Sequence, residues 1–330
     1  MDILNTIKDK ARRLNRTVVL PEGTEERSIV AARNLVEEKI AKVVLLGDPK
    51  EIAALAAKNG LDTGKVTIIN PPTAPDYASF VEMLFERRKA KGMTHEQAAE
   101  AMKTPLYFGA AMVKTGKADA SVAGAINTTG NVLRAALHVI GLAPGITTVS
   151  SSFLMTIPEF LGEKDKILMF ADCAVVPNPD PEQLASIAAS TADTMMKLTG
   201  QTPKVAFLSF STKGSAEHED VDKVRKALEI FKANHPKIEA DGELQLDAAI
   251  LPKVGAKKAP GSTVAGQANV LIFPDLDAGN IGYKLTERLA KATATGPIIQ
   301  GLALPANDLS RGCSADDIVN VSAIAVLLKG

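Results

Sequence analysis

The sequence contains few aromatic residues and has no dominant charge. Aromatic side chains make up 4% of its 330 residues, tryptophan is absent, and 38 Lys and Arg residues balance 38 Asp and Glu residues. Nucleic-acid-binding proteins usually carry a clustered basic excess or aromatic side chains on which bases stack. The composition therefore argues against a nucleic-acid partner.

Cysteine and histidine are also scarce. Cys173 and Cys313 are the only cysteines, they form no CxxC pair, and the four histidines show no metal-binding spacing. Two distant thiols fit a reducing compartment, and no ligand cluster for a metal is visible. We therefore expect a cytoplasmic protein with no disulfide framework and no bound metal.

Long apolar runs are missing as well. No stretch approaches the roughly 18 apolar residues of a membrane-spanning helix. The first residues, MDILNTIKDKARRLNRTVVLPEG, lack the uninterrupted apolar stretch of a secretion signal. We expect no association with a membrane.

Short β-branched runs alternate with amphipathic helical stretches along most of the chain. RTVVLPEG precedes TEERSIVAARNLVEE, and AKVVLLGDP precedes KEIAALAAKNG. Such alternation predicts parallel sheets with helices on both faces. Continuous apolar strands such as VVLL and VLIF fit burial on both sides of a sheet. The expected fold class is α/β.

Two regions depart from this alternation. Residues 149–180 contain two strands joined by a charged, glycine-containing turn, which predicts an antiparallel hairpin. Residues 235–253 are interpreted as a short polar connection. The length suggests about two domains, and a natural change of domain lies just before the hairpin, around residues 141–148.

Ligands of parallel α/β sheets bind beyond the carboxyl ends of the strands, where helix N-termini attract anions. The loop 124–130 contains two glycines, Thr128 and Thr129 before a helix, with Arg134 one turn inside that helix. Hydroxyls, backbone amides and a guanidinium together could form a phosphate cradle. The spacing is not that of a Walker A motif, and no GxGxxG fingerprint follows any strand. An ordinary capped helix with a solvated Arg134 is the alternative.

The segment 306–317 is a second candidate, because it follows a strand and precedes the last helix. It contains Ser310, Arg311 and Asp317. The alternative is structural, since Ser314 and Asp317 have the spacing of a capping box that holds a helix end.

Two further features have ordinary explanations. The charged run 86–92, which includes Arg88, is typical of a solvated helix face, although it could bind a distant phosphate. Cys173 follows an aspartate at a strand end without a neighbouring base. A buried structural thiol is therefore favoured over a nucleophile.

On these segments the sequence resembles the phosphate acetyltransferase (phosphotransacetylase) family, in its short form without an additional N-terminal regulatory domain. The resemblance covers essentially the whole chain and is strongest in GPIIQGLALPANDLSRGCSADDIV, FPDLDAGNIGYKL, FADCAVVPNPDPEQLA and ERRKAKG. Two departures stand out. Asn127 and Asn131 occupy a loop where many members have His or an acidic residue, and Arg87 precedes Arg88 where the family often has an apolar residue.

The resemblance implies two α/β domains with a cleft between them, similar to isocitrate and isopropylmalate dehydrogenases but without NAD. We expect a first domain of residues 1–145 plus 300–330 and a second domain of residues 146–299 that contains the hairpin. The implied activity is that of a cytoplasmic acyltransferase of acetate metabolism: acetyl-CoA plus phosphate gives acetyl phosphate plus CoA. Coenzyme A is then a substrate, no cofactor is needed, and the enzyme is expected to be a homodimer.

The resemblance also implies roles for individual residues. Ser310, Arg311 and Asp317 match the family's catalytic segment, and Arg88 and Arg134 match arginines associated with CoA and phosphate binding; we add Thr128 and Thr129 as substrate-binding residues. In the implied mechanism Asp317 removes the proton of the CoA thiol, and the thiolate attacks the acetyl carbonyl without a covalent enzyme intermediate.

Three other functions compete with this one. A phosphate butyryltransferase would differ in the room of its acyl pocket. A non-catalytic regulatory module that binds acetyl-CoA occurs attached to malic enzymes, but no malic half is present in this chain. An NAD-linked dehydrogenase is disfavoured because the carboxylate cluster for a metal and the dinucleotide fingerprint are missing.

Overall fold

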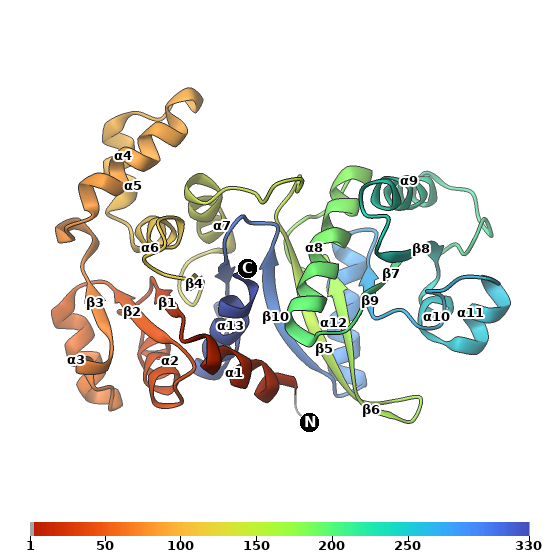
Figure 1. Ribbon diagram of the computed structural model, residues 1–330, viewed down its shortest axis with the longest axis horizontal. Coiled ribbons are helices and arrows are strands. Elements are labelled where there is room, and N and C mark those ends of the chain that lie inside the picture. The colour runs from red at the N-terminus through yellow and green to blue at the C-terminus, as the bar shows by residue number, and fades with distance from the viewer. Residues whose placement is uncertain (1–2, 330) are drawn as a thin grey trace. The chain divides into compact units, whose positions relative to one another are not determined.

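The computed structural model describes residues 3–329 and divides into two compact units. The N-terminal unit comprises Leu4–Ala143 and the segment from Leu302 onward, and the central unit comprises Pro144–Gly301. Each unit has its own β-sheet with helices packed on it (Figure 1). The α/β fold class predicted from the sequence is confirmed.

The sheet of the N-terminal unit has five strands, all parallel, in the order β11-β4-β1-β2-β3. Its strands are, in chain order, β1 (Thr17–Leu20), β2 (Lys42–Leu46), β3 (Thr67–Ile69), β4 (Ala120–Ala123) and β11 (Ala306–Asp308). The chain starts at β1, adds β2 and β3 on one side, and then adds β4 and β11 on the other. The strand order therefore reverses between β1 and β4, which is where open α/β sheets bind ligands.

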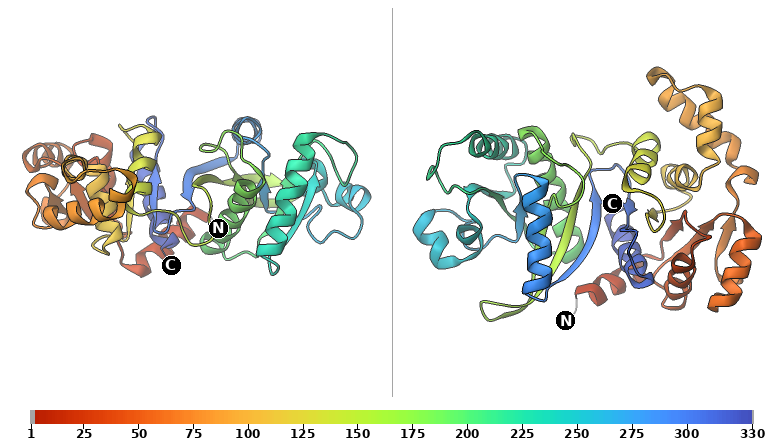
Figure 2. Two further views of the ribbon diagram at one scale, coloured as in Figure 1. Left: turned by 90° about the horizontal axis from the view of Figure 1, so that it is seen from above. Right: turned by 180° about the vertical axis from the view of Figure 1, so that it is seen from behind.

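Helices cover both faces of this sheet (Figure 2). Helices α2 and α13 pack against each other on one face, and α6 and α7 pack against each other on the opposite face. The helices of the unit are α1 (Ile3–Leu14), α2 (Glu26–Glu37), α3 (Pro49–Asn59), α4 (Tyr77–Arg88), α5 (His95–Met102), α6 (Pro105–Lys114), α7 (Thr129–Val139) and α13 (Ala315–Leu328). Short 3-10 turns lie at Thr63–Lys65, Pro71–Thr73 and Lys89–Lys91.

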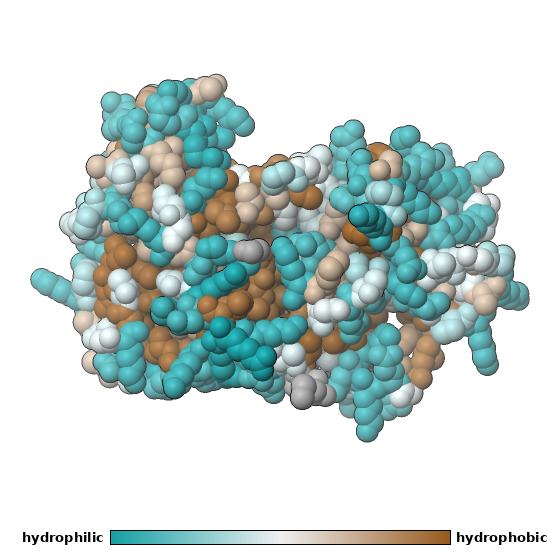
Figure 3. Space-filling model, in the orientation of Figure 1, coloured by the Kyte–Doolittle hydropathy of each residue, from teal (hydrophilic) through white to brown (hydrophobic). Residues whose placement is uncertain are grey.

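Helices α4 and α5 form an arm whose inner side packs on α6 and α7. Phe80 of α4 and Phe108 of α6 are both 1% exposed, and their ring centroids lie 5.0 Å apart. The surface of the arm is mostly hydrophilic (Figure 3), and Glu82 and Glu86 of α4 are exposed. This amphipathic packing places the basic end of α4, with Arg88, beside α7.

The sheet of the central unit has six strands in the order β10-β5-β6-β9-β7-β8. Its strands are β5 (Ser150–Phe160), β6 (Glu163–Ala171), β7 (Lys204–Leu208), β8 (Glu239–Leu244), β9 (Val270–Ile272) and β10 (Thr293–Gln300). Strands β5 and β6 form an antiparallel hairpin, β10 is antiparallel to β5, and β6, β9, β7 and β8 are parallel. Its helices are α8 (Pro181–Thr199), α9 (Glu219–Asn234), α10 (Leu246–Ile250), α11 (Pro252–Lys258) and α12 (Leu276–Leu289).

The segment before the last helix forms two strands in different units. Residues up to Gln300 belong to β10 in the central unit, whereas β11 starts at Ala306 in the N-terminal unit. Gly301 separates the two strands with φ 89°, and a Cβ there would lie 2.5 Å from the carbonyl oxygen of Thr148. The chain can turn at this point only because residue 301 is a glycine.

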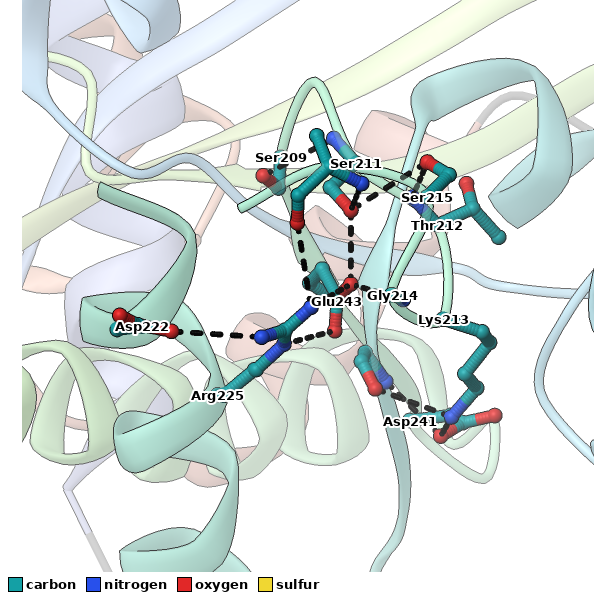
Figure 4. A network of polar contacts seen from close by, with 12 residues as sticks. Ser209, Ser211, Thr212, Lys213, Gly214, Ser215, Asp222, Arg225, Asp241 and Glu243 are labelled. Carbon is teal, nitrogen blue, oxygen red and sulfur yellow. Dashed lines mark hydrogen bonds and ion pairs between the residues drawn. The ribbon is translucent and has the colours of Figure 1, made fainter. Parts of the chain in front are cut away.

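The interpretation of residues 235–253 as a polar connection is wrong, because they include strand β8. Asp241 and Glu243 of β8 are only 8% and 3% exposed. Each is paired: Asp241 with Lys213, and Glu243 with Arg225 at 3.1 Å (Figure 4). Burial raises the pKa of Glu243, but Arg225 and the N–H of Gly214 outweigh it and lower the pKa to about 2. Charged residues are rare in strands, so only these distant partners reveal why this segment is buried.

Candidate active site

Glu22 organises the carboxyl edge of the N-terminal sheet. It follows β1 and is 5% exposed. Its carboxylate accepts four successive backbone N–H groups, from Gly124, Ala125, Ile126 and Asn127, at 3.0, 2.7, 3.2 and 2.9 Å. The side-chain amide of Asn127 adds a fifth bond of 2.8 Å. The loop after β4 is therefore fixed by a residue that follows the neighbouring strand β1.

Arg27, on the first turn of α2, connects the loop after β4 to the loop after β11. Its guanidinium donates to the carbonyl oxygen of Ala125 at 2.9 Å and to those of Arg311 and Cys313, both at 2.8 Å. An ion pair of 2.7 Å with Glu25 holds the guanidinium in place. Because Arg27 binds the backbone of residues 311–313, the loop is held while the side chain of Arg311 stays exposed.

Asp308 is a buried carboxyl group at the end of β11, only 2% exposed. The hydroxyl of Thr129, at the start of α7, donates to it at 2.6 Å. Gly124 approaches so closely, with φ 117°, that a Cβ there would lie 2.5 Å from Asp308 Oδ1. Burial raises the pKa of Asp308 to about 6, and the charge of Glu22 acts in the same direction.

The predicted catalytic residues follow Asp308 on the loop and at the start of α13. Ser310 and Arg311 are exposed, and Ser310 Oγ accepts the N–H of Gly312 at 3.3 Å. Asp317 forms the capping box that the sequence offered as its alternative role. Its carboxylate accepts the N–H and hydroxyl of Ser314 at 2.8 and 2.9 Å, while Ser314 Oγ accepts the N–H of Asp317. Asp317 is nevertheless exposed at the helix end.

The predicted substrate-binding residues lie on and beside α7. Thr128 caps the helix by accepting the N–H of Asn131, and the exposed Arg134 donates to Asn131 Oδ1 at 3.2 Å. Arg88, at the end of α4, lies 3.3 Å from Nε2 of His138 on α7. Arg88 and Arg134, 46 positions apart in the sequence, thus meet at one helix.

A pocket of about 360 Å³ lies in the N-terminal unit at the reversal of strand order. Its walls are the loop after β1, the end of β2, the N-terminus of α6 (residues 104–107), and residues Ile126, Asn127, Asn131 and Arg134. Of the predicted site residues Arg134 lines this pocket; Ser310, Arg311 and Asp317 lie outside its walls. Between residues 3 and 329 no group of three or more His, Cys, Asp or Glu residues is placed to hold a metal ion.

The two cysteines are buried thiols. Burial raises the pKa of Cys173 well above its ordinary value, with Asp172 acting in the same direction. A thiol held in its protonated form is a poor nucleophile, so the structural interpretation of Cys173 is favoured. Burial also raises the pKa of Cys313, which lies 3.8 Å from Arg27.

Sequence reasoning missed Glu22, Arg27 and Asp308. Glu22 lies two residues after the apolar strand β1, and a carboxylate at that position was a usable signal. The others depend on contacts between distant segments, such as the 284 positions that separate Arg27 from Arg311. No local pattern contains such contacts.

An all-parallel sheet with a pocket at its reversal of strand order, lined in part by Arg134 and the N-terminus of α6, is the arrangement in which open α/β proteins bind ligands. The sequence model of the family described as "Phosphate acetyl/butaryl transferase" matches residues 2–326. The chain belongs to this family. Among residues 3–329, no helix has both the length and the apolar character needed to cross a bilayer.

Individual relatives agree with this assignment. A phosphate acetyltransferase of Clostridium acetobutylicum is 50% identical over 99% of this chain and 98% of its own length. A phosphotransacetylase structure from Streptococcus pyogenes is 43% identical, covers 98% of this chain and 97% of its own, and superposes with a TM-score of 0.93. A protein described as a 4-hydroxythreonine-4-phosphate dehydrogenase from Salmonella typhimurium, at 12% identity and a TM-score of 0.60, covers 95% of this chain and 99% of its own and shares the fold.

The raised pKa of Asp308 predicts a pH-dependent stability. The folded pKa of about 6 exceeds the ordinary value of 3.8, so the stability contribution of Asp308 is greatest below pH 4 and is lost as the pH rises through 6. Ionising this group in place costs about 3 kcal/mol by that difference. Asp308→Asn keeps an acceptor for Thr129 and has no charge to bury. Its stability relative to the parent chain should therefore increase as the pH rises from 5 to 8.

The measurement is urea unfolding of both proteins at pH 5 and pH 8. The exposed Asp316→Asn serves as the control, because its change should not depend on the burial of a charge. A stability difference between parent and Asp308→Asn that is the same at both pH values would contradict this assignment.

Proposed function

We propose that this chain catalyses the reversible transfer of an acetyl group between coenzyme A and inorganic phosphate. The observation that supports this most strongly is the similarity to named phosphate acetyltransferases over nearly the whole of both chains. These relatives share about half of their residues with this chain, and the matches cover 98% of their own lengths. The family description covers butyryl transfer too, but the relatives that share about half of their residues with this chain carry the acetyl name.

In the direction that forms acetyl-CoA, the reaction starts from the CoA thiol, whose pKa of about 8.5 leaves little thiolate at neutral pH. Asp317 accepts the thiol proton, and sulfur attacks the carbonyl carbon of acetyl phosphate. The sulfur–carbon bond forms, the carbon–oxygen bond to phosphate breaks, and the proton finally passes to phosphate. Coenzyme A takes part as a substrate, so the chemistry requires no separate cofactor.

Ser310 and Arg311 stabilise the charges that develop in this step. The Ser310 hydroxyl donates to the carbonyl oxygen, and one such donor contributes about 3–4 kcal/mol to many transition states. Arg311 binds the phosphate through two parallel N–H bonds. The support for these roles is that Arg27 holds the backbone of the loop from behind, so both side chains are exposed on a fixed loop.

Arg88, Arg134, Thr128 and Thr129 bind the phosphate-bearing substrates in this proposal. Their support is position: Thr128 and Thr129 form the start of α7, Arg134 lines the pocket, and Arg88 contacts the same helix. The N-terminus of α7 and the positive charge of Arg134 both attract anions, whereas Arg88 contacts α7 near its other end, at His138.

We also infer that the enzyme acts in the cytoplasm as a homodimer. Two unpaired cysteines in the chain support a reducing compartment. Helix α12 covers one side of the central sheet (Figure 2) and exposes Ile281, Leu285 and Leu289 at 56%, 53% and 79%. Residues four apart lie on one face of a helix, so these form a continuous apolar stripe. We infer that a second copy of the chain covers this stripe. In a dimer with two-fold symmetry, the stripe of one copy can pack against the same stripe of the other.

Asp317→Asn separates catalysis from capping. The change should lower kcat for thioester formation from CoA and acetyl phosphate at least 100-fold, because the variant lacks the carboxylate base. The stability cost should be about 1 kcal/mol, as for the loss of a helix cap. Turnover is measured as thioester formation with acetyl and butyryl phosphate, and stability is measured by urea unfolding. In the parent chain, thioester formation should be fastest with acetyl phosphate.

Ser314→Ala is the matched control, because it removes the other half of the same capping box and keeps the carboxylate. It should lose similar stability while keeping most of the activity. Equal activity of Asp317→Asn and Ser314→Ala would leave Asp317 with a structural role only. Faster turnover with butyryl phosphate would make the chain a butyryltransferase.

Leu285→Glu tests the dimer. A charge at the centre of the apolar stripe cannot be buried against a second copy without a large cost. The variant should sediment as a monomer at concentrations where the parent chain sediments as a dimer, while its circular dichroism spectrum is unchanged. The exposed Leu161, on the hairpin outside the stripe, provides the control Leu161→Glu. A dimer that persists in Leu285→Glu would place the interface elsewhere.

A further inference from the structure

Side chains from three helices form a hydrogen-bonded chain beside the pocket of the N-terminal unit. Arg88 of α4 lies 3.3 Å from Nε2 of His138 on α7, and Nδ1 of His138 lies 2.9 Å from the hydroxyl of Tyr107 on α6. Tyr107 and Arg134 line the pocket, whereas His138 is not among the residues of its walls. None of the functional assignments above uses Tyr107 or His138.

The direction of each hydrogen bond in this chain follows from the chemistry of the three groups. A guanidinium can only donate, so Nε2 of His138 must accept from Arg88. A neutral imidazole has one N–H, which must therefore be on Nδ1. Nδ1 then donates to the oxygen of Tyr107, and the proton of the Tyr107 hydroxyl is not used within the chain.

The Tyr107 hydroxyl can donate its proton to an anion in the pocket, because other groups that attract anions line the same pocket. Residues 104–107, the N-terminus of α6, line the same pocket. Thr104 makes no side-chain cap there, so the first N–H groups of α6 are not capped by it. The positive guanidinium of Arg134 lies on the opposite helix of the same pocket. Burial raises the pKa of Tyr107, which outweighs the opposite effect of Arg134 and Arg88 and keeps its proton in place.

We propose that Tyr107 is a further binding residue that donates its hydroxyl to a phosphate group of coenzyme A, and that His138 is the positioning residue that directs this donor. The inference rests on the proposed function, since it takes CoA as the ligand. It adds a neutral donor, the Tyr107 hydroxyl, to the proposed binding residues Arg88 and Arg134, and it assigns the orientation of this hydroxyl to His138. The hydrogen bond that the Tyr107 oxygen accepts from His138 fixes the direction in which its O–H can point.

The charges around His138 keep its imidazole neutral and so preserve the hydrogen bonds that join Arg88, His138 and Tyr107. Arg88 of α4, Lys91 in the turn after α4, Tyr107 of α6 and Arg134 of α7 are the titratable groups that act on it or contact it. Burial lowers the pKa of His138, and the three cations lower it further. A protonated His138 could not accept a hydrogen bond from Arg88, so this series of hydrogen bonds forms only with a neutral His138. CoA affinity should therefore weaken as His138 takes up a proton at acidic pH.

Tyr107→Phe tests the inference, with CoA binding measured by isothermal titration calorimetry. A hydrogen bond to a charged group typically changes affinity about ten-fold or more, so Kd for CoA should rise by at least this factor. The KM for CoA should rise in parallel while kcat stays within about two-fold, because the phosphate group is remote from the reacting sulfur. Tyr77→Phe is the matched control, since the Tyr77 hydroxyl donates to the carbonyl oxygen of Ala99 and lies outside the pocket.

Two substitutions of His138 test its positioning role. His138→Asn keeps a nitrogen donor near the place of Nδ1, whereas His138→Gln places its amide near Nε2 and leaves Tyr107 without that donor. The Asn variant should bind CoA more tightly than the Gln variant. Adding Tyr107→Phe should weaken binding further in the Asn variant and not in the Gln variant, because residues of one network are not additive.

The outcomes are distinct. An unchanged Kd for CoA in Tyr107→Phe overturns the inference, whether or not the enzyme turns over. Equal affinities of the His138→Asn and His138→Gln variants overturn the positioning role. Failure of the parent chain to form a thioester from any acyl phosphate contradicts the proposed function, and the calorimetric comparison still decides on Tyr107.

Discussion

The buried carboxylate of Glu22 is the interaction on which the rest of the site depends. Four backbone N–H groups in a row point at it from the loop after β4. The N–H groups of Gly124 and Ala125 are buried, and a buried N–H without a partner costs about 1–3 kcal/mol, so this part of the loop depends on that acceptor. The carboxylate in turn is stable in a buried position because five donors replace its water. The loop and the glutamate therefore stabilise each other.

Two consequences follow for the site. With the loop fixed, Ala125 presents its carbonyl oxygen to Arg27, which uses its remaining bonds to hold the loop after β11. The same loop places Thr129 at the start of α7, where its hydroxyl contacts the buried Asp308. Residues that follow β1, β4 and β11 thus form one hydrogen-bonded edge. Ser310, Arg311 and Asp317 stand exposed on that edge, available for substrates.

The sequence was most informative where local pattern decides structure. Apolar strands such as TVVL and KVVLL, each followed by a polar loop and a helix, predicted the α/β class correctly, because burial on both faces requires continuous apolar runs. The pattern failed at β8, whose buried Asp241 and Glu243 are stable only next to Lys213 and Arg225. For the site, Ser314 and Asp317 were recognised as a capping pair from their spacing. Arg27 and His138 could not be recognised, because their partners on other elements lie 31 to 286 positions away.

The most direct test of this account is amide hydrogen exchange at residues 124–127 in Glu22→Gln, measured together with thioester formation. Glutamine keeps the shape of the side chain but has one oxygen in place of two, so it cannot accept all four N–H groups. The account predicts faster exchange at these residues, unchanged exchange in β5 and β6 of the central unit, and a lower rate of thioester formation. Unchanged exchange at residues 124–127 in a folded, fully active variant would contradict the claim that Glu22 holds the site together.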